Sequence, residues 1–142
     1  MDSERITVST LEEYDFVDDM IIEYNQEQVP FTQDPPFIHV NRVIKNEDGE
    51  IIAGINSIMY CWNCMAIDVL WVEEKHRKKG YGEKLLHEVE KIAIENGCGL
   101  IQLDTFDFQS KDFYLKNGYV VFGALEDCPT GHTRYYMKKN LG

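Results

Sequence analysis

The sequence predicts an α+β fold in which a mixed, mostly antiparallel sheet is flanked by helices. The first half of the chain is rich in strand-like alternation, whereas strand-like and helix-like segments alternate after residue 65. The chain has 142 residues and 44% of them are hydrophobic, which is enough to bury one sizeable core. No linker or internal repeat interrupts the pattern, so we expect a single domain over residues 1–142.

The N-terminal part is expected to contain a short strand, a helix and an irregular segment. Residues 5–9 have the composition of a strand, and Thr10 is a suitable N-cap for the helix that follows. The apolar residues of this helix recur on one face, at Tyr14, Val17, Ile21 and Tyr24. Prolines at positions 30, 35 and 36 prevent the helix from continuing.

The remaining elements follow from hydrophobic periodicity and turn signals. Asp48-Gly49 is a hairpin turn between strands at 38–45 and 51–61, and Asn96-Gly97 ends an amphipathic helix. Further strands are expected at 65–72, 100–103, 119–125 and 132–138, and a short helix at 110–117.

The junction between the strand at 65–72 and the amphipathic helix holds the run Arg77-Lys78-Lys79-Gly80-Tyr81-Gly82. Its two glycines allow a sharp turn that directs backbone N–H groups at one ligand, and the next helix adds partial positive charge at its N-terminus. The chain is acidic, with 25 Asp and Glu against 14 Lys and Arg, so a local basic cluster indicates an anionic ligand. We therefore expect a phosphate or pyrophosphate to bind here; the alternative is a plain turn with solvated lysines.

This run resembles the Arg/Gln-x-x-Gly-x-Gly/Ala motif of the GNAT family of N-acetyltransferases, in the form Arg77-x-x-Gly80-x-Gly82. Phe113-Tyr114-Leu115-Lys116-Asn117-Gly118-Tyr119 is similar to the Tyr-x-x-x-Gly-Phe/Tyr signature that the family carries roughly thirty residues later. The resemblance covers residues 50–139 well. It implies the GNAT fold, with six or seven strands in a sheet that splays between its fourth and fifth strands, and an acetyl-CoA-dependent N-acetyltransferase.

The resemblance also implies roles for particular residues. Backbone groups of Leu70, Trp71 and Val72 are implied to bind the pantetheine arm and the thioester carbonyl of acetyl-CoA, and residues 77–82 its pyrophosphate. Fixed N–H donors suit a carbonyl that becomes an oxyanion when an amine attacks it. Tyr114 is implied to protonate the departing thiolate of coenzyme A; the alternative is that it only packs its helix onto the sheet.

A general base is needed because a protonated amine has no free lone pair with which to attack the thioester. Asp68 is our candidate, since some polyamine-acetylating members of the family carry an acidic residue at this position. Strand alternation is expected to place Ala66, Asp68 and Leu70 on one face. The branch that acetylates histones has a glutamate at the position of Ala66, which counts against that acceptor. The alternative is that Asp68 pairs with a strand neighbour and that water relays the proton.

One position departs from the family pattern. Many relatives have an asparagine seven residues before the tyrosine, where it binds the cofactor arm, and this chain has Asp107. An ionised aspartate only accepts hydrogen bonds and repels phosphates, so the resemblance does not carry this contact over. Asp107 is still suitable as a cap for the short helix.

The acceptor is expected to be a primary amine of a small cationic molecule. Residues 1–36 contain ten Asp or Glu and a single Arg, which is either a surface that attracts cations or a solvated helix face. The loop 31–37 and the strand residues 132–136 are candidates to line the acceptor pocket. A non-catalytic acyl-CoA-binding sensor and a protein or peptide acetyltransferase are the alternatives.

Composition argues against other classes. One small basic cluster lacks the extended positive surface that nucleic acids require. Neither a membrane-spanning run nor a leader is recognisable, which predicts a cytoplasmic protein without a membrane partner. Cys61-Trp62-Asn63-Cys64 has the spacing of a metal site, but no second pair completes it, so we expect no metal, four reduced thiols and a tight turn. A homodimer is kept open as the oligomeric state.

Overall fold

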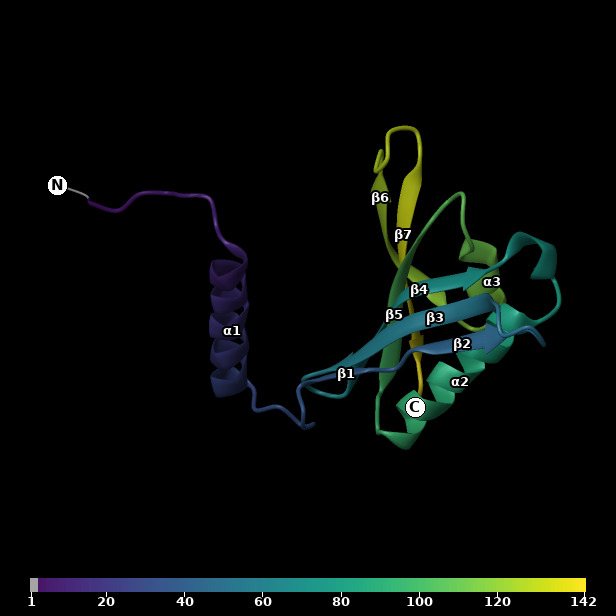
Figure 1. Ribbon diagram of the computed structural model, residues 1–142, viewed down its shortest axis with the longest axis horizontal. Coiled ribbons are helices and arrows are strands. Elements are labelled where there is room, and N and C mark those ends of the chain that lie inside the picture. Colours follow the sequence, from purple (N-terminus) through teal and green to yellow (C-terminus); the bar gives the residue numbers. More distant parts are fainter. Residues whose placement is uncertain (1–2) are drawn as a thin grey trace. The chain divides into compact units, whose positions relative to one another are not determined.

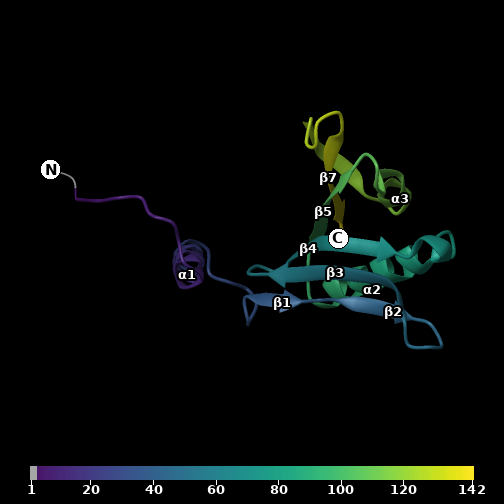
Figure 2. The same cartoon turned by 45° about the horizontal axis from the view of Figure 1, so that its top comes forward.

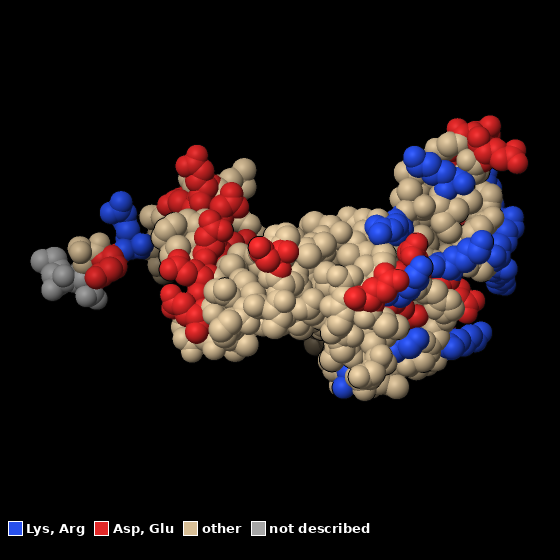
Figure 3. Space-filling view, turned by 90° about the horizontal axis from the view of Figure 1, so that it is seen from below, with Lys and Arg blue, Asp and Glu red and all other residues tan. Residues whose placement is uncertain are grey.

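The computed structural model describes residues 3–142. By its internal contacts the chain divides into an N-terminal unit that ends at Phe31 and a larger unit, Thr32–Gly142. None of the helices in the described part of the chain is long and apolar enough to cross a membrane. Acidic side chains follow the helix of the N-terminal unit, whereas Lys and Arg side chains are spread over the larger unit (Figure 3).

The N-terminal unit contains one helix, α1 (Leu11–Gln28) (Figure 1). It begins where the sequence predicts, because the Thr10 hydroxyl accepts from the Glu13 N–H at 3.1 Å and the Glu13 carboxylate accepts from the Thr10 N–H at 2.9 Å. The predicted apolar face is present, and nothing within this unit covers it; Val17, for example, is 62% exposed. The strand predicted at residues 5–9 is wrong. A strand needs a hydrogen-bonded neighbour, and residues 3–31 contain no strand at all.

The larger unit is built on one seven-stranded sheet with the order β1-β3-β4-β5-β7-β6, and β2 pairs with β3 as well. The strands are β1 (Phe37–His39), β2 (Arg42–Lys45), β3 (Ile51–Tyr60), β4 (Cys64–Val72), β5 (Leu100–Phe106), β6 (Val120–Glu126) and β7 (Thr133–Asn140). The helices are α2 (Tyr81–Glu95), α3 (Lys111–Lys116) and the short 3-10 turn η1 (Glu74–His76). Only β4 and β5 run parallel, so the predicted mixed and mostly antiparallel sheet is confirmed.

One predicted strand is divided in two. The segment predicted at 38–45 forms β1 and β2, because the side chain of Asn41 leaves the ladder and accepts a hydrogen bond from the Ser57 N–H at 3.0 Å. Because of this division the sheet still has seven strands, although residues 5–9 do not form one. The predicted turns are confirmed, and Gly49 has φ +81°, a value that favours glycine.

The core lies between α2 and one face of the sheet. Figure 2 shows α2 running alongside β2, β3 and β4, the strands with which it makes most of its contacts. Its apolar stripe is buried at Leu85, Leu86, Val89 and Ala93, as the helical spacing predicts. From the sheet, Ile55 of β3 and Ile101 of β5 are completely buried in the same cluster.

The sheet is irregular at two points that matter for the site. β4 pairs with β5 only where Met65–Ile67 faces Ile101–Leu103, and beyond these residues the two strands separate. This is the splay that the resemblance implies. β4 also has a bulge, because Asn56 of β3 faces Val69 and the next residue, Ser57, faces Ile67. Asp68 is therefore an extra residue without a partner across the ladder.

The Cys61–Cys64 segment forms the tight turn between β3 and β4, as predicted. All four cysteines carry free thiols. Burial raises the pKa of the Cys61 and Cys98 thiols, so the protein holds both in the protonated, weakly reactive form.

Candidate active site

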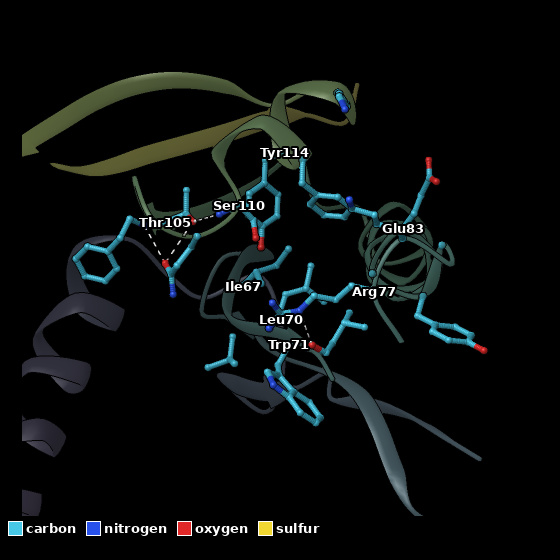
Figure 4. A pocket seen from close by; sticks show the side chains of 18 of the residues that line it. Ile67, Leu70, Trp71, Arg77, Glu83, Thr105, Ser110 and Tyr114 are labelled. Carbon is cyan, nitrogen blue, oxygen red and sulfur yellow. Dashed lines mark hydrogen bonds between the residues drawn. The ribbon is translucent and has the colours of Figure 1, made fainter. Parts of the chain in front are cut away.

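A cleft of about 860 Å³ opens in the larger unit at the point where β4 and β5 separate (Figure 4). Its floor is the end of β4, and its walls are the loop before α2, the end of β5 with the loop that follows, and α3. The side chains and backbone that line it belong to Ile67, Asp68, Val69, Leu70, Trp71, Val72, His76, Arg77, Lys78, Gly80, Tyr81, Gly82, Glu83, Asp104, Thr105, Phe106, Phe108, Gln109, Ser110, Phe113, Tyr114 and Lys116.

The glycine-containing loop forms one end of the cleft. Gly80 is the N-cap of α2 with φ +84°, and the first hydrogen bond of the helix runs from the Lys84 N–H to the Gly80 carbonyl at 3.0 Å. The N–H groups of residues 81–83 have no acceptor within residues 3–142, as is usual in the first turn of a helix. These free donors and the helix dipole favour a bound phosphate.

The cationic side chains of the loop divide into two groups. Arg77 and Lys78 line the cleft, and Lys79 does not. The Arg77 Nε donates to the carbonyl oxygen of Val72 at 3.0 Å, which ties the loop to the end of β4 (Figure 4). Lys116, at the end of α3, adds another positive charge to the lining. These positive charges favour an anion, and the pyrophosphate-binding role of the loop stays a prediction.

The end of β4 presents a free backbone edge to the cleft. Leu70, Trp71 and Val72 pair with β3 on one side, and β5 pairs with none of them on the other. Amide groups of a ligand can therefore bind along this edge as an added strand would. That these residues bind a pantetheine arm stays a prediction.

The prediction that Ala66, Asp68 and Leu70 share one face is wrong. Across the ladder with β3, Leu70 pairs with Ile55, which is completely buried, whereas Ala66 pairs with Ile58. Ile55 and Ile58 are three residues apart in one strand, so their side chains point to opposite sides of the sheet. The bulge at Asp68 shifts the alternation by one residue, so Ala66 and Leu70 lie on opposite faces of the sheet.

Asp68 is exposed and lines the cleft. Among residues 3–142 its carboxylate has neither a hydrogen-bond donor nor an ion-pair partner. The alternative in which Asp68 pairs with a strand neighbour is therefore not what the structure contains. A free carboxylate in a cleft is available to a cationic ligand.

Tyr114 reaches the cleft from α3, and its hydroxyl is directed toward β4 (Figure 4). The side chain is 5% exposed, and its ring packs edge-on against Phe113 at 5.2 Å and Tyr119 at 5.6 Å between centroids. Burial, with a smaller contribution from the Asp104 carboxylate, raises the pKa of Tyr114 to about 12. The phenol is therefore neutral at physiological pH and able to donate a proton.

Sequence reasoning missed Asp104, which also lines the cleft. Its carboxylate lies 2.9 Å from Arg134 of β7, whose guanidinium packs over the rings of Phe106 and Tyr136. The predicted strand ended one residue earlier, at 103. A carboxylate directly after a buried apolar run, at the carboxyl end of a strand, is the signal that would have identified it.

Asp107 does not cap α3, contrary to the expectation that it was suited to do so. Its carboxylate lies 2.8 Å from His132 Nδ1 and accepts from the Thr133 N–H at 2.9 Å, so it fastens the loop after β5 to the start of β7. The Thr133 N–H is the main reason that the pKa of Asp107 is lowered. The N-cap position of α3 is Ser110.

Of the segments 31–37 and 132–136, which were expected near the acceptor, residues 32–37 and 132–136 do not line the cleft. The first is held at the turn between β3 and β4, where Gln33 donates to the Met59 carbonyl at 3.0 Å and accepts from the Asn63 N–H at 3.0 Å. That turn lies at the start of β4, whereas the cleft lies at its end. The second reaches the site only indirectly, through the ion pair of Arg134 with Asp104.

The fold and this cleft together define an acyltransferase of the kind that binds an acyl carrier with a diphosphate. A helix N-terminus with free N–H groups and a basic loop suits the diphosphate, and the free edge of β4 suits the amide-containing arm. A neutral buried phenol at the end of that edge suits a departing thiolate.

Comparison with known proteins identifies the family. The sequence matches the Acetyltransferase (GNAT) family over residues 5–119. It is 34% identical to the blasticidin-S acetyltransferase of Streptomyces morookaense over 96 residues, which are 67% of this chain and 70% of that protein. The chain therefore belongs to the GNAT family. It is an acetyltransferase, and acetyl-CoA is its co-substrate.

Solved structures agree with this assignment. An acetyltransferase from Bacillus cereus ATCC 14579 is 41% identical, with a TM-score of 0.87 over 96% of this chain and 97% of that one. A candidate streptothricin acetyltransferase from Bacillus anthracis strain Ames, solved with acetyl coenzyme A, is 21% identical. It has a TM-score of 0.65 over 78% of this chain and 65% of that one, and shares the fold.

Proposed function

We propose that this enzyme transfers the acetyl group of acetyl-CoA to a primary amine of a small cationic molecule, by direct attack of the bound amine on the thioester. The observation that carries the proposal is the unpaired carboxylate of Asp68 in the same cleft as the glycine-containing loop. Opposite charges at two places in one cleft suit two ligands, an anionic carrier and a cationic acceptor.

In this proposal Asp68 is the base. Its carboxylate attracts the ammonium form of the acceptor and accepts the proton that must leave before the nitrogen can attack. The bulge makes this possible, because it removes Asp68 from the regular ladder and exposes its side chain at the point where β4 and β5 diverge. Another carboxylate of the cleft, Asp104, is already paired with Arg134 and is a weaker candidate.

Tyr114 is the proposed acid. With its pKa raised to about 12, transfer of its proton to a thiolate whose acid has a pKa of ~8.5 is uphill by about 5 kcal/mol. That cost is smaller than the barrier of about 16 kcal/mol that corresponds to a turnover of about 10 per second. The proton transfer is therefore compatible with ordinary enzymatic rates.

Blasticidin S is the first acceptor to test, since the relative with 34% identity is named for its acetylation. Coenzyme A release is measured with blasticidin S, a polyamine and a lysine-containing peptide under the same conditions. Turnover with a small cationic amine supports the proposal. Turnover with the peptide but with neither blasticidin S nor the polyamine would show that a small cationic amine is the wrong class of acceptor.

The role of Asp68 is tested separately with Asp68→Asn, which keeps the shape of the side chain and removes its charge. We expect kcat/KM for the amine to fall by about 100-fold or more, the usual contribution of a general base, while acetyl-CoA binds as before. Asp48→Asn, in the hairpin turn before β3, is the matched control and should have full activity. Full activity of Asp68→Asn would exclude the assignment.

A further inference from the structure

A buried carboxylate lies in the larger unit outside the reacting groups. Glu90 of α2 is 6% exposed, and a charge in such a place is costly unless it is paired and hydrogen-bonded. Both requirements are met on one oxygen. Glu90 Oε2 accepts from the Tyr119 hydroxyl at 2.8 Å and from Lys139 Nζ at 3.1 Å.

This cluster of Glu90, Tyr119 and Lys139 joins α2, the residue that follows the α3 turn, and β7. Glu90 belongs to α2, which begins at the glycine-containing loop; Tyr119 follows α3; and Lys139 belongs to β7. Among residues 3–142 no other side-chain hydrogen bond or ion pair connects α2 with α3 or with β7. Among residues 3–142, Glu90 is therefore the polar link between the helix that follows the glycine-containing loop and the segment that follows the helix of Tyr114.

Tyr119 is also in direct contact with Tyr114. Its ring is 1% exposed and meets the Tyr114 ring edge-on at 5.6 Å between centroids. Its N–H donates to the Tyr114 carbonyl at 3.0 Å. Tyr119 thus contacts both the ring and the backbone of Tyr114, while its own hydroxyl is anchored on Glu90.

We propose that Glu90 and Tyr119 are positioning residues for the reaction: they hold the Tyr114 hydroxyl at the end of the β4 edge. The inference rests on the proposed role of Tyr114 as the acid. An edge-on ring contact alone allows sliding, whereas a hydroxyl held by a buried, ion-paired carboxylate fixes the ring in one place. Small errors in the placement of a reacting group are costly to the rate, so the anchor acts on kcat.

The test is a double-mutant cycle of Tyr119→Phe and Tyr114→Phe, with kcat and KM for acetyl-CoA measured for the four proteins. We expect Tyr119→Phe alone to lower kcat by about 10- to 100-fold, while KM changes less than about twofold. In the Tyr114→Phe background the same change should have no further effect on kcat, because the group that it positions is absent.

Conservative rescue separates positioning from packing. Glu90→Gln keeps an acceptor for the Tyr119 hydroxyl and should retain more of kcat than Glu90→Leu, which removes it. Ile101→Val, a core variant outside the hydrogen-bonded cluster, measures how far a loss of stability alone affects kcat.

The outcomes are distinct. An equal loss of kcat from Tyr119→Phe in both backgrounds, or no loss in either, overturns the positioning role and leaves Tyr114 as the acid. Unchanged turnover of Tyr114→Phe overturns the acid role itself, and the inference with it.

Discussion

Gly80 offers the sharpest test of the anion-binding loop. Its φ of +84° lies in the left-handed region, and a Cβ added there would meet nothing within 4 Å. Any harm done by Gly80→Ala therefore comes from backbone conformation and not from a clash. The nearby Gly82 is the matched control, because its φ is not in that region and an added Cβ would make ordinary contacts at 3.5 Å with Phe113 and 3.7 Å with Val72.

The magnitudes for Gly80→Ala follow from this geometry. An L-residue in the left-handed region costs about 1–2 kcal/mol, and about 0.4–1 kcal/mol is regained because alanine restricts the unfolded chain. The net loss in free energy of unfolding is therefore about 1 kcal/mol, or roughly 2–8 °C in Tm. If the loop relaxes by turning one N–H away from the diphosphate, a charge-assisted hydrogen bond of about 1.5–3 kcal/mol is lost, which weakens the Kd by about 10- to 150-fold.

Thermal unfolding and calorimetry with acetyl-CoA measure the two effects. Gly80→Ala should lower both Tm and affinity, whereas Gly82→Ala should keep affinity and leave Tm equal or higher, since alanine favours a helix by up to about 1 kcal/mol. Gly80→Asn should recover part of both losses, because asparagine adopts the left-handed region more readily. Gly80 has no special part in anion binding if Gly80→Ala binds acetyl-CoA like the unchanged protein, or if Gly82→Ala weakens binding more than Gly80→Ala does.

Three further predictions concern the proposed acid Tyr114, the Asp107–His132 contact that we call the clamp, and the oligomeric state. Tyr114→Phe should lower kcat by about 10²- to 10⁴-fold without changing the calorimetric Kd of acetyl-CoA, and an equal loss of binding would argue for a packing role. The folded protein lowers the pKa of Asp107, so the ionised carboxylate stabilises the fold. This stabilisation is complete above the pKa of ~3.9 that aspartate has in the unfolded chain, and it is lost as the pH falls through the lower pKa of the folded state. Asp107→Asn should therefore lower Tm more at neutral pH than at about pH 2, and an equal change at both pH values would contradict this. The homodimer stays a prediction: nothing within its own unit covers the apolar stripe of α1, and an uncovered stripe favours association. Val17→Lys should therefore shift the sedimentation equilibrium toward monomer while Asp18→Lys does not, and a monomeric unchanged protein refutes the prediction.

Local patterns in the sequence were sufficient for most of the elements and for the two motifs. The capping box at Thr10, the stripe of α2 and the glycine-containing loop depend on residues within one or two turns of one another, and such neighbours are encoded in spacing. The motifs then identified the cleft-lining residues of the loop, the β4 edge and Tyr114, all of which the structure brings together except Lys79.

Tertiary structure alone decided the features that depend on two distant segments. The bulge that exposes Asp68 and turns Leu70 inward is a mismatch between β3 and β4, which no single strand contains. The strand expected at residues 5–9 has no other strand within its unit to pair with, so its strand propensity alone does not produce a strand. The clamp of Asp107 with His132 and the anchor of Glu90 with Tyr119 and Lys139 join side chains 25 to 49 residues apart. Hydrophobic periodicity indicates on which face of a helix or strand a residue lies. Which side chain of a distant element it contacts is determined only by how the elements pack together.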